Sequence, residues 1–156
     1  MRSLLRLRRS RLAGRLAYLP TLVALAAGLI FVSFGAGHFA DHAAEVGDFR
    51  RYQVPFASFA VWAVGVVESS AGMALLLGLF VRPAAALLAA DMLGVVATAG
   101  RVEGGLLNLG VAPLLLATMV FLLWAGPGAV SLDTALDRRT RSRARSSGDC
   151  GQLAVR

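Results

Sequence analysis

Residues 56–99 decide the fold, because they form two long apolar runs joined by a short turn. The first run, residues 56–80, reads FASFAVWAVGVVESSAGMALLLGLF. Val81-Arg82-Pro83 follows, and the second run, residues 84–99, reads AAALLAADMLGVVATA. The first run has 25 residues, enough for a helix to cross the hydrocarbon core of a bilayer, which is about 30 Å thick. Because the connection is so short, the two runs are predicted to form an antiparallel helical hairpin inside a membrane.

The composition places the whole chain in the same class. The 156 residues are 57% hydrophobic and the mean hydropathy is +0.68, well above that of an ordinary water-soluble domain. The isoelectric point near 11.4 comes largely from arginines in two tails, which favours an anionic membrane surface over nucleic acid as the partner. Cys150 is the single cysteine, so the chain offers no internal disulfide or CxxC pair.

Two further apolar runs flank the hairpin. The predicted fold is therefore all-α: an integral membrane antiparallel four-helix bundle, occupying residues 16–137. Its spans are expected at about residues 16–37, 56–80, 83–99 and 106–125. Pro113 is expected to kink the fourth span, because proline lacks the backbone N–H that a helix uses.

The remaining segments are polar or basic. Residues 38–55 mix charges with recurring apolar side chains, which predicts a short helix lying on the mouth of the bundle. Residues 1–15 are predicted to be a basic tail at the lipid head groups. Residues 138–156 are rich in arginine and serine and are predicted to be disordered. Ser131-Leu132-Asp133 is a candidate cap for one more short helix after the fourth span.

The placement of arginines predicts the orientation. The N-terminal tail holds six, the turn between the second and third spans one, and the C-terminal tail six. The opposite side holds only Arg50, Arg51 and Arg101. Since positively charged loops stay in the cytoplasm, both termini are predicted to be cytoplasmic, which four spans satisfy.

Each arm of the hairpin contains one acid, Glu68 in the first and Asp91 in the second. A charge is costly in lipid, so both side chains are expected to face the protein interior. Glu68 is the best candidate for a functional residue, as a proton-carrying or quinone-binding carboxylate, although a structural hydrogen bond explains it about as well. Counted from Arg82, Glu68 lies 14 residues away and Asp91 nine, a depth difference of about 7–8 Å. A shared polar site therefore requires helix tilt or long side chains.

The polar segment adds weaker candidates. His38, His42 and Glu45 stand at positions i, i+4 and i+7, so one helix face could present two imidazoles and a carboxylate to a divalent metal. A solvated helix has the same pattern, and the prediction is that no metal binds. Arg51 is a candidate partner of Glu68, an attractor of anions or a contact of lipid head groups. No phosphate-binding loop, dinucleotide glycine motif or HExxH occurs.

Several motifs resemble those of the DoxX family of small four-span bacterial membrane proteins, over roughly residues 20–135. They are Gly28-Leu-Ile-Phe31, Gly65-x-x-Glu68-x-x-x-Gly72-x-x-Leu75-Leu-Leu-Gly78-Leu-x-x-Arg82-x-Ala84-Ala85, Met92, and Gly126-Pro127-Gly128-x-x-Ser131-Leu132-Asp133. The family commonly has Gly-x-x-Lys after the first span, where this chain has Gly35-x-x-His38. An acid often starts the last span, where this chain has Asn108.

The resemblance implies a multi-pass protein of the bacterial cytoplasmic membrane. It also implies association with sulfur, thiol or oxidative-stress redox systems, with quinone as a candidate ligand and a redox enzyme as a candidate partner. Asp91, His38, Arg51 and Asn108 are then the candidate partners of Glu68. The chain lacks an obvious electron carrier, which favours an accessory subunit over an independent enzyme. A carrier of a small solute or protons, and a membrane anchor without chemistry, remain alternatives.

Overall fold

Helices form every regular element in the described part of the chain, which is residues 12, 14–128, 130–133 and 135 of the computed structural model. In chain order they are η1 (Gly14–Tyr18), α2 (Leu19–Ala40), α3 (His42–Arg51), α4 (Ala57–Leu77), α5 (Val81–Ala97), α6 (Ala99–Val102), the π-helical segment η2 (Leu107–Val111) and α7 (Ala112–Ala125). The predicted tail at 138–156, and the tail at 1–15 apart from residues 12, 14 and 15, lie outside the described residues.

Four stretches are long and apolar enough to cross a membrane. They are Leu16–Ala40, Ala57–Leu77, Val81–Val102 and Asn108–Ala125. The predicted all-α four-helix membrane bundle is therefore confirmed. The short helix expected within residues 38–55 is α3, which has no buried residue and lies at one end of the bundle.

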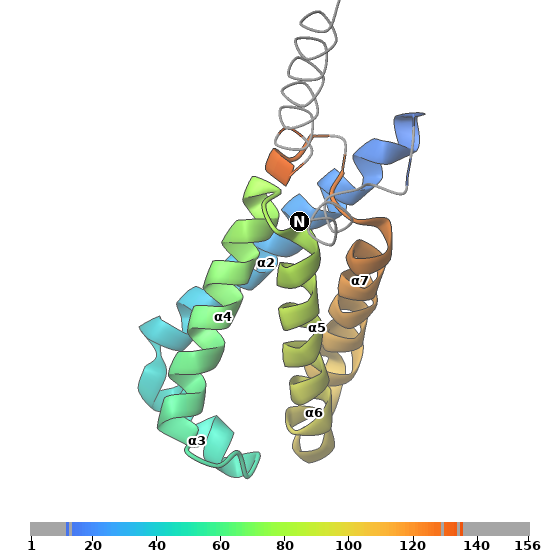
Figure 1. The fold of residues 1–156 in the computed structure, drawn as a ribbon. Helices are drawn as coiled ribbons and strands as arrows, with labels where there is room; N and C mark the ends of the chain where they lie inside the picture. Colours follow the sequence, from blue (N-terminus) through green and yellow to red (C-terminus); the bar gives the residue numbers. More distant parts are fainter. Residues whose placement is uncertain (1–11, 13, 129, 134, 136–156) are drawn as a thin grey trace, which may run out of the picture.

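The helices associate as two pairs. In Figure 1, α2 lies beside α4 and α5 lies beside α7, while α3 and α6 occupy the same end of the bundle. Glycines allow α2 and α4 to pack closely, because a Cβ atom at Gly28 would lie only 2.8 Å from the Gly72 carbonyl oxygen. The backbones of α2 and α4 therefore lie in close contact at these glycines.

Large apolar side chains fill the centre of the bundle. The largest fully buried ones on the four spans are Phe31, Leu75, Leu88, Met119 and Leu122. Many others are exposed along the outside of the same helices, including Leu22, Leu29, Val66, Leu87 and Leu114. A surface of this kind suits contact with lipid tails rather than water.

The turn between α4 and α5 is held by the C-terminal segment. Gly78 ends α4 with φ of +62°, a left-handed conformation that favours glycine. The carboxylate of Asp133 accepts a hydrogen bond from the Val81 backbone N–H at 3.2 Å, and the Asp133 N–H donates to the Gly78 carbonyl at 3.0 Å. A helical turn does begin at Ser131, but the Asp133 side chain caps α5 rather than that turn.

The fourth span is irregular where proline interrupts it. The π-helical segment η2 ends at Val111, and Pro113 occupies the first turn of α7. Proline cannot donate a hydrogen bond to the carbonyl four residues earlier, and its ring crowds that carbonyl, so the preceding turn widens. The kink predicted at Pro113 stays a prediction, and the irregularity that the structure shows is the π-helical segment just before it.

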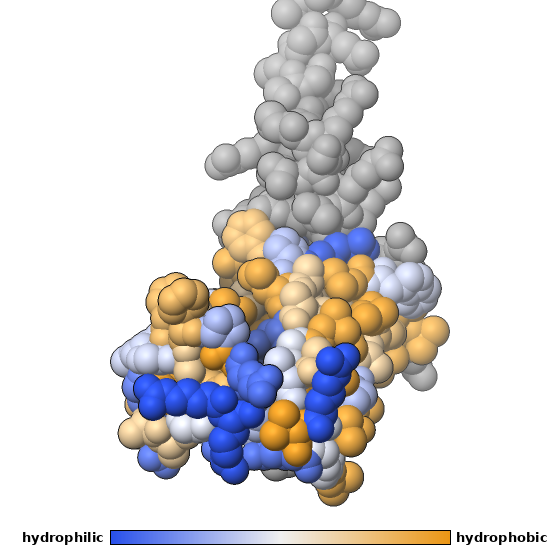
Figure 2. Space-filling view, turned by 90° about the horizontal axis from the view of Figure 1, so that it is seen from below, coloured by the Kyte–Doolittle hydropathy of each residue, from blue (hydrophilic) through white to orange (hydrophobic). Residues whose placement is uncertain are grey.

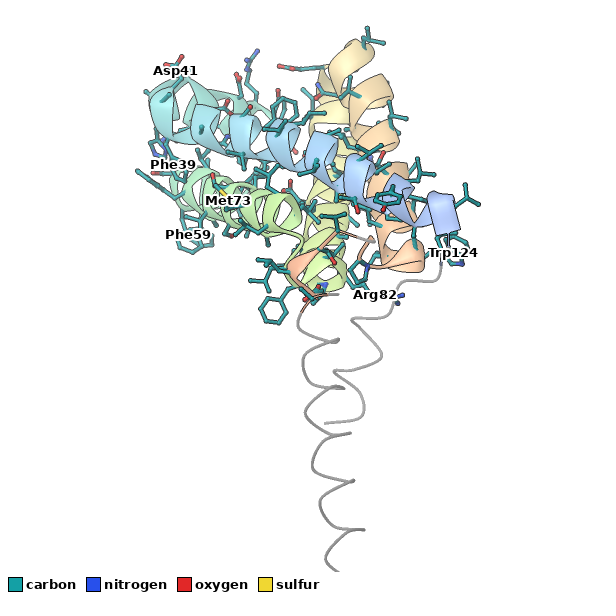
Figure 3. The ribbon with its side chains drawn as sticks, turned by 90° about the horizontal axis from the view of Figure 1, so that it is seen from above. Phe39, Asp41, Phe59, Met73, Arg82 and Trp124 are labelled. Atoms are coloured by element: carbon teal, nitrogen blue, oxygen red, sulfur yellow. The ribbon has the colours of Figure 1, made fainter. Side chains whose placement is uncertain are left out.

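The two ends of the bundle differ in polarity. At one end, an Arg82 guanidinium nitrogen donates to the Trp124 carbonyl at 3.4 Å, and Figure 3 shows these two residues at the end away from Asp41. At the other end, hydrophilic side chains gather on the face formed by α3 and α6, with hydrophobic ones around them (Figure 2). We call this the α3 end.

Candidate functional site

Glu68 is the buried acid around which the site forms. Its side chain is only 3% exposed, near the middle of α4. Gly65, one turn earlier, has no side chain, and a Cβ there would lie 3.0 Å from the His38 Cβ. The missing side chain lets the end of α2 approach α4, so that the His38 imidazole reaches the buried carboxylate.

His38 contacts one carboxylate with each ring nitrogen. Nε2 lies 3.3 Å from Oε2 of Glu68, and Nδ1 lies 3.1 Å from Oε2 of Glu45 on α3. Exposure of the side chains rises along this series, from 3% for Glu68 to 14% for His38 and 32% for Glu45. The Phe49 ring packs against the His38 imidazole, with 5.9 Å between the ring centroids and the two ring planes nearly perpendicular.

Asp91 joins the same group from α5. It lies close enough to Glu68 for the two side chains to interact electrostatically, despite the depth difference counted from the sequence. Its Oδ2 atom is buried and has no hydrogen-bond partner among the described residues. Two negative charges placed close together in a protein interior repel each other, so these two carboxyl groups are a candidate site for holding a proton.

A pocket opens beside these groups. Its volume is about 330 Å³, within the range of small-molecule sites. Polar atoms come from His38, Glu45, Glu68 and Asn108, the last on η2. The rest of the wall is mainly apolar or small and includes Ser33, Phe34, Gly37, Met92, Val95, Val111, Ala112 and Leu115. The predicted partners His38, Asp91 and Asn108 are therefore brought to the neighbourhood of Glu68.

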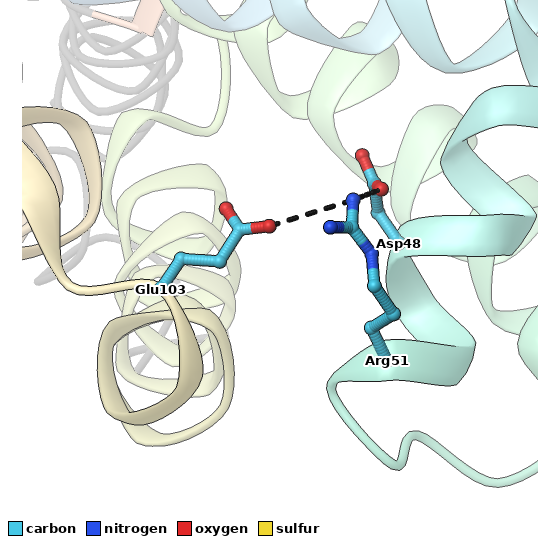
Figure 4. A network of polar contacts seen from close by, with 3 residues as sticks. All are labelled: Asp48, Arg51 and Glu103. Atoms are coloured by element: carbon cyan, nitrogen blue, oxygen red, sulfur yellow. Dashed lines mark hydrogen bonds and ion pairs between the residues drawn. The ribbon is translucent and has the colours of Figure 1, made fainter.

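Arg51 is placed elsewhere. Its guanidinium contacts Asp48 on α3 and lies 3.6 Å from Glu103, which follows α6 (Figure 4). Burial and a hydrogen bond to Glu103 raise the pKa of the neighbouring Tyr52 to about 12, so this phenol stays neutral at physiological pH. These contacts link α3 to α6 across the α3 end, and they do not bring Arg51 to Glu68.

The three metal candidates separate in space. His38 and Glu45 lie together, but the His42 ring packs against Trp62, with 5.0 Å between centroids and a tilt of 38°, and its Nε2 is 3.3 Å from the Ser58 hydroxyl. Across the described residues, no group of three histidine, cysteine or acidic side chains could hold a metal ion. The i+7 spacing of His38 and Glu45 did signal proximity, but the two side chains meet as an ion pair across the α2–α3 break rather than on one helix face.

Sequence reasoning did not find the role of Glu103. It lies in the short loop after α6 and meets α3 only in the folded bundle. Sequence reasoning also did not identify Ser33 and Val95 as residues that line the pocket, because neither belongs to a motif or a recognisable spacing. The pairing of α2 with α4 and α5 with α7 decides which faces of these helices line the pocket.

The fold and site define a small integral membrane protein: a four-helix bundle with one acidic and imidazole-lined pocket near its α3 end. The family described as DoxX matches residues 14–101, more than half of the chain. The chain is also 38% identical, over 131 aligned positions, to an uncharacterized membrane protein of Mycobacterium tuberculosis. That similarity covers 75% of this chain and 80% of the relative. No solved structure matches.

This chain belongs to the DoxX family.

Proposed function

We propose that this DoxX-family protein is the integral subunit of a membrane redox system and binds the head group of a quinone in its polar pocket. The observation that carries the proposal is the buried Glu68–His38 pair, which faces a pocket of about 330 Å³ with mainly apolar walls. Quinones are membrane-soluble and carry two oxygens that accept hydrogen bonds. A site that is apolar around a few convergent polar groups suits such a ligand.

Some side chains of the site can exchange protons, and others can hold the ligand in position. The Asn108 amide and the His38 imidazole can bind ligand oxygens. Two buried atoms of residues that line the pocket, Nδ1 of His38 and Oε2 of Glu68, have no hydrogen-bond partner among the described residues. A quinone supplies two-electron chemistry when bound, and its reduced form gives up two protons with two electrons. Glu68 and His38 can take up protons. The electrons pass to a redox centre on a partner protein.

The setting proposed for this function is the cytoplasmic membrane of a bacterium. Membrane lipids surround the apolar outer faces of the spans, and the α3 end faces the outside, following the arginine distribution. The sulfur, thiol or oxidative-stress associations implied by the family resemblance fit a redox partner at this membrane.

A proton or small-solute carrier is the second candidate, favoured by the presence of two neighbouring acids, Glu68 and Asp91, inside the bundle. The bundle centre away from the α3 end argues against it. Among the described residues, Phe31, Leu75 and Leu88 are at most 1% exposed, and a second pocket of about 730 Å³ near the α4–α5 turn is lined by no acid, base or histidine. The polar cluster therefore does not continue to that end, which fits a ligand site better than a proton path through the bundle.

Binding of a short-chain quinone to the purified protein in lipid nanodiscs tests the proposal. Glu68→Gln keeps the size of the side chain but not its charge, so the charge-assisted hydrogen bonds at the site weaken. We expect the affinity to fall about tenfold, equivalent to about 1.4 kcal/mol. Ser70→Ala, on the same helix but exposed and outside the pocket, is the control and should bind normally.

Glu68→Leu separates binding from folding. Leucine leaves His38 without its buried partner, so this variant should also unfold more easily, by about 1–3 kcal/mol. Equal quinone affinity in the wild type and in a well-folded Glu68→Gln protein would remove the quinone proposal. Solute or proton flux in liposomes that depends on Glu68 would support the carrier instead.

A further inference from the structure

His38 is the one described residue that touches both the buried acid pair and the polar α3 end. From this we infer that His38 and Glu45 form a proton route between the Glu68–Asp91 pair and the α3 face of the protein. The inference rests on the proposed function, because the route would carry the protons of the pocket chemistry. Its test, however, contains no quinone.

The geometry gives the order of the route. Asp91 lies beside Glu68 inside the bundle, Oε2 of Glu68 lies 3.3 Å from Nε2 of His38, and Nδ1 of His38 lies 3.1 Å from Oε2 of Glu45. The last two are ion-pair contacts without hydrogen-bond geometry at His38 Nδ1 and Glu68 Oε2, so each transfer requires a small rotation of the imidazole or of a carboxyl group. Increasing exposure of these side chains leads outward from the core.

The chemistry needs only the two ring nitrogens of His38. A proton leaves the Glu68–Asp91 pair and binds Nε2, and the proton on Nδ1 passes to the Glu45 carboxylate. One N–H bond forms while another breaks, so the imidazole is neutral before and after the step. A second transfer in the opposite direction, or a turn of the ring, restores the starting tautomer. Histidine is suited to this because its neutral imidazole has one nitrogen that accepts a proton and one N–H that donates, and it loses only one proton near neutral pH.

The groups around His38 come from each element that packs on it. Glu45 faces it from α3 and Glu68 from α4, Asp91 stands behind Glu68 on α5, and the neutral Asn108 lines the same pocket from η2. No cation of the described residues lies within ion-pair distance of Glu68 other than His38. The aromatic ring of Phe49 covers one edge of the imidazole. Protons are therefore directed along the carboxylate contacts.

His42 provides a matched comparison. It is the only other histidine of the chain, and it also lies at the α3 end. Its ring packs against Trp62 and its Nε2 meets the Ser58 hydroxyl, so it contacts neither carboxylate of the route. A general effect of removing an imidazole from this end would appear in both histidine variants. An effect of the route would appear only in His38 variants.

Time-resolved infrared spectroscopy of the ligand-free protein in nanodiscs tests the route. After transfer to D2O, the C=O band of the protonated carboxyl group shifts as its proton exchanges, and Glu68→Gln and Asp91→Asn identify that band. We expect His38→Gln to slow the exchange about tenfold or more. Glu45→Gln should slow it in the same direction, and His42→Gln should leave the rate unchanged.

Unchanged exchange in His38→Gln would overturn the route, as would the absence of a protonated carboxyl band in the wild type. If His38→Gln does not fold, Glu45→Gln decides the question, because Glu45 lies on α3, a helix without buried residues. Exchange at the wild-type rate in Glu45→Gln would then overturn it. Quinone affinity is a separate measurement. The exchange rates can therefore be interpreted even if the protein does not bind quinone.

Discussion

Asp133 shows how one buried carboxylate can hold a turn that is distant in sequence. It is 2% exposed and bonds to the backbone at both Gly78 and Val81, 52 positions from the latter. The four N-terminal N–H groups of a helix have no partner inside the helix, and α5 has no side-chain cap from its own preceding residue. Asp133 supplies that cap, so the C-terminal segment stabilises the central hairpin.

Asp133→Ala should lower the free energy of unfolding by about 1–2 kcal/mol, because the start of α5 loses its acceptor. Asp133→Asn retains a side-chain oxygen and should be less destabilising than alanine. Titration with SDS in mixed micelles measures the difference. If the alanine variant is as stable as the wild type, the contact does not hold the turn.

Glycine spacing explains the close contact between helices α2 and α4. Gly28 and Gly35 on α2, like Gly65 and Gly72 on α4, are seven residues apart and so lie on one helix face. A Cβ at Gly35 would lie 2.7 Å from the Ser69 backbone nitrogen and 2.9 Å from the Gly65 carbonyl. The same close approach brings His38 to Glu68, so the packing of the two helices also builds the site.

Gly35→Ala should therefore force α2 and α4 apart and destabilise the bundle by about 1–3 kcal/mol. The matched control is Gly37→Ala, two residues later on α2, where an added Cβ meets nothing within 4 Å. Alanine favours helix more than glycine does, so this control should be neutral or slightly stabilising. Unfolding of both variants in the same detergent gives the comparison. Equal stabilities would contradict the close packing.

The whole molecule is asymmetric along the membrane normal. The polar pocket, α3 and the Arg51–Glu103 contact lie at one end. The Arg82–Trp124 contact lies at the other (Figure 3). Among the described residues, α2 begins and α7 finishes at the end away from α3. The arginine count of thirteen to three in the sequence then predicts that this end is cytoplasmic and that the α3 end, with the pocket, faces outward.

Reporter fusions at residue 46, within α3, and at the C-terminus should report opposite sides of the membrane. An alkaline phosphatase reporter is active only outside the cytoplasm and a fluorescent protein matures efficiently inside it. We therefore expect phosphatase activity at residue 46 and fluorescence at the C-terminus. The same side for both would contradict the predicted topology, and reversed signals would place the pocket in the cytoplasm.

The sequence by itself determined the class of protein, the four spans and the candidates of the site. Long apolar runs fix these features because a bilayer demands about 20 apolar helical residues per crossing, a local property of the chain. Glu68 and Asp91 stood out for the same reason, as acids that lipid does not tolerate. Asn108 entered through the family resemblance.

Which of those residues meet depends on how the helices pack, and this became visible only in the tertiary structure. The separation of Glu68 and Asp91 counted along two ideal helices was about 7–8 Å in depth, and it neglects tilt and side-chain reach. Arg51 pairs with Asp48 and Glu103, and His42 with Trp62, because the α2–α3 break and the position of α6 set those contacts. Helix pairing joins residues far apart in sequence, and lipid-facing apolar residues carry no signal of which neighbour each helix will choose.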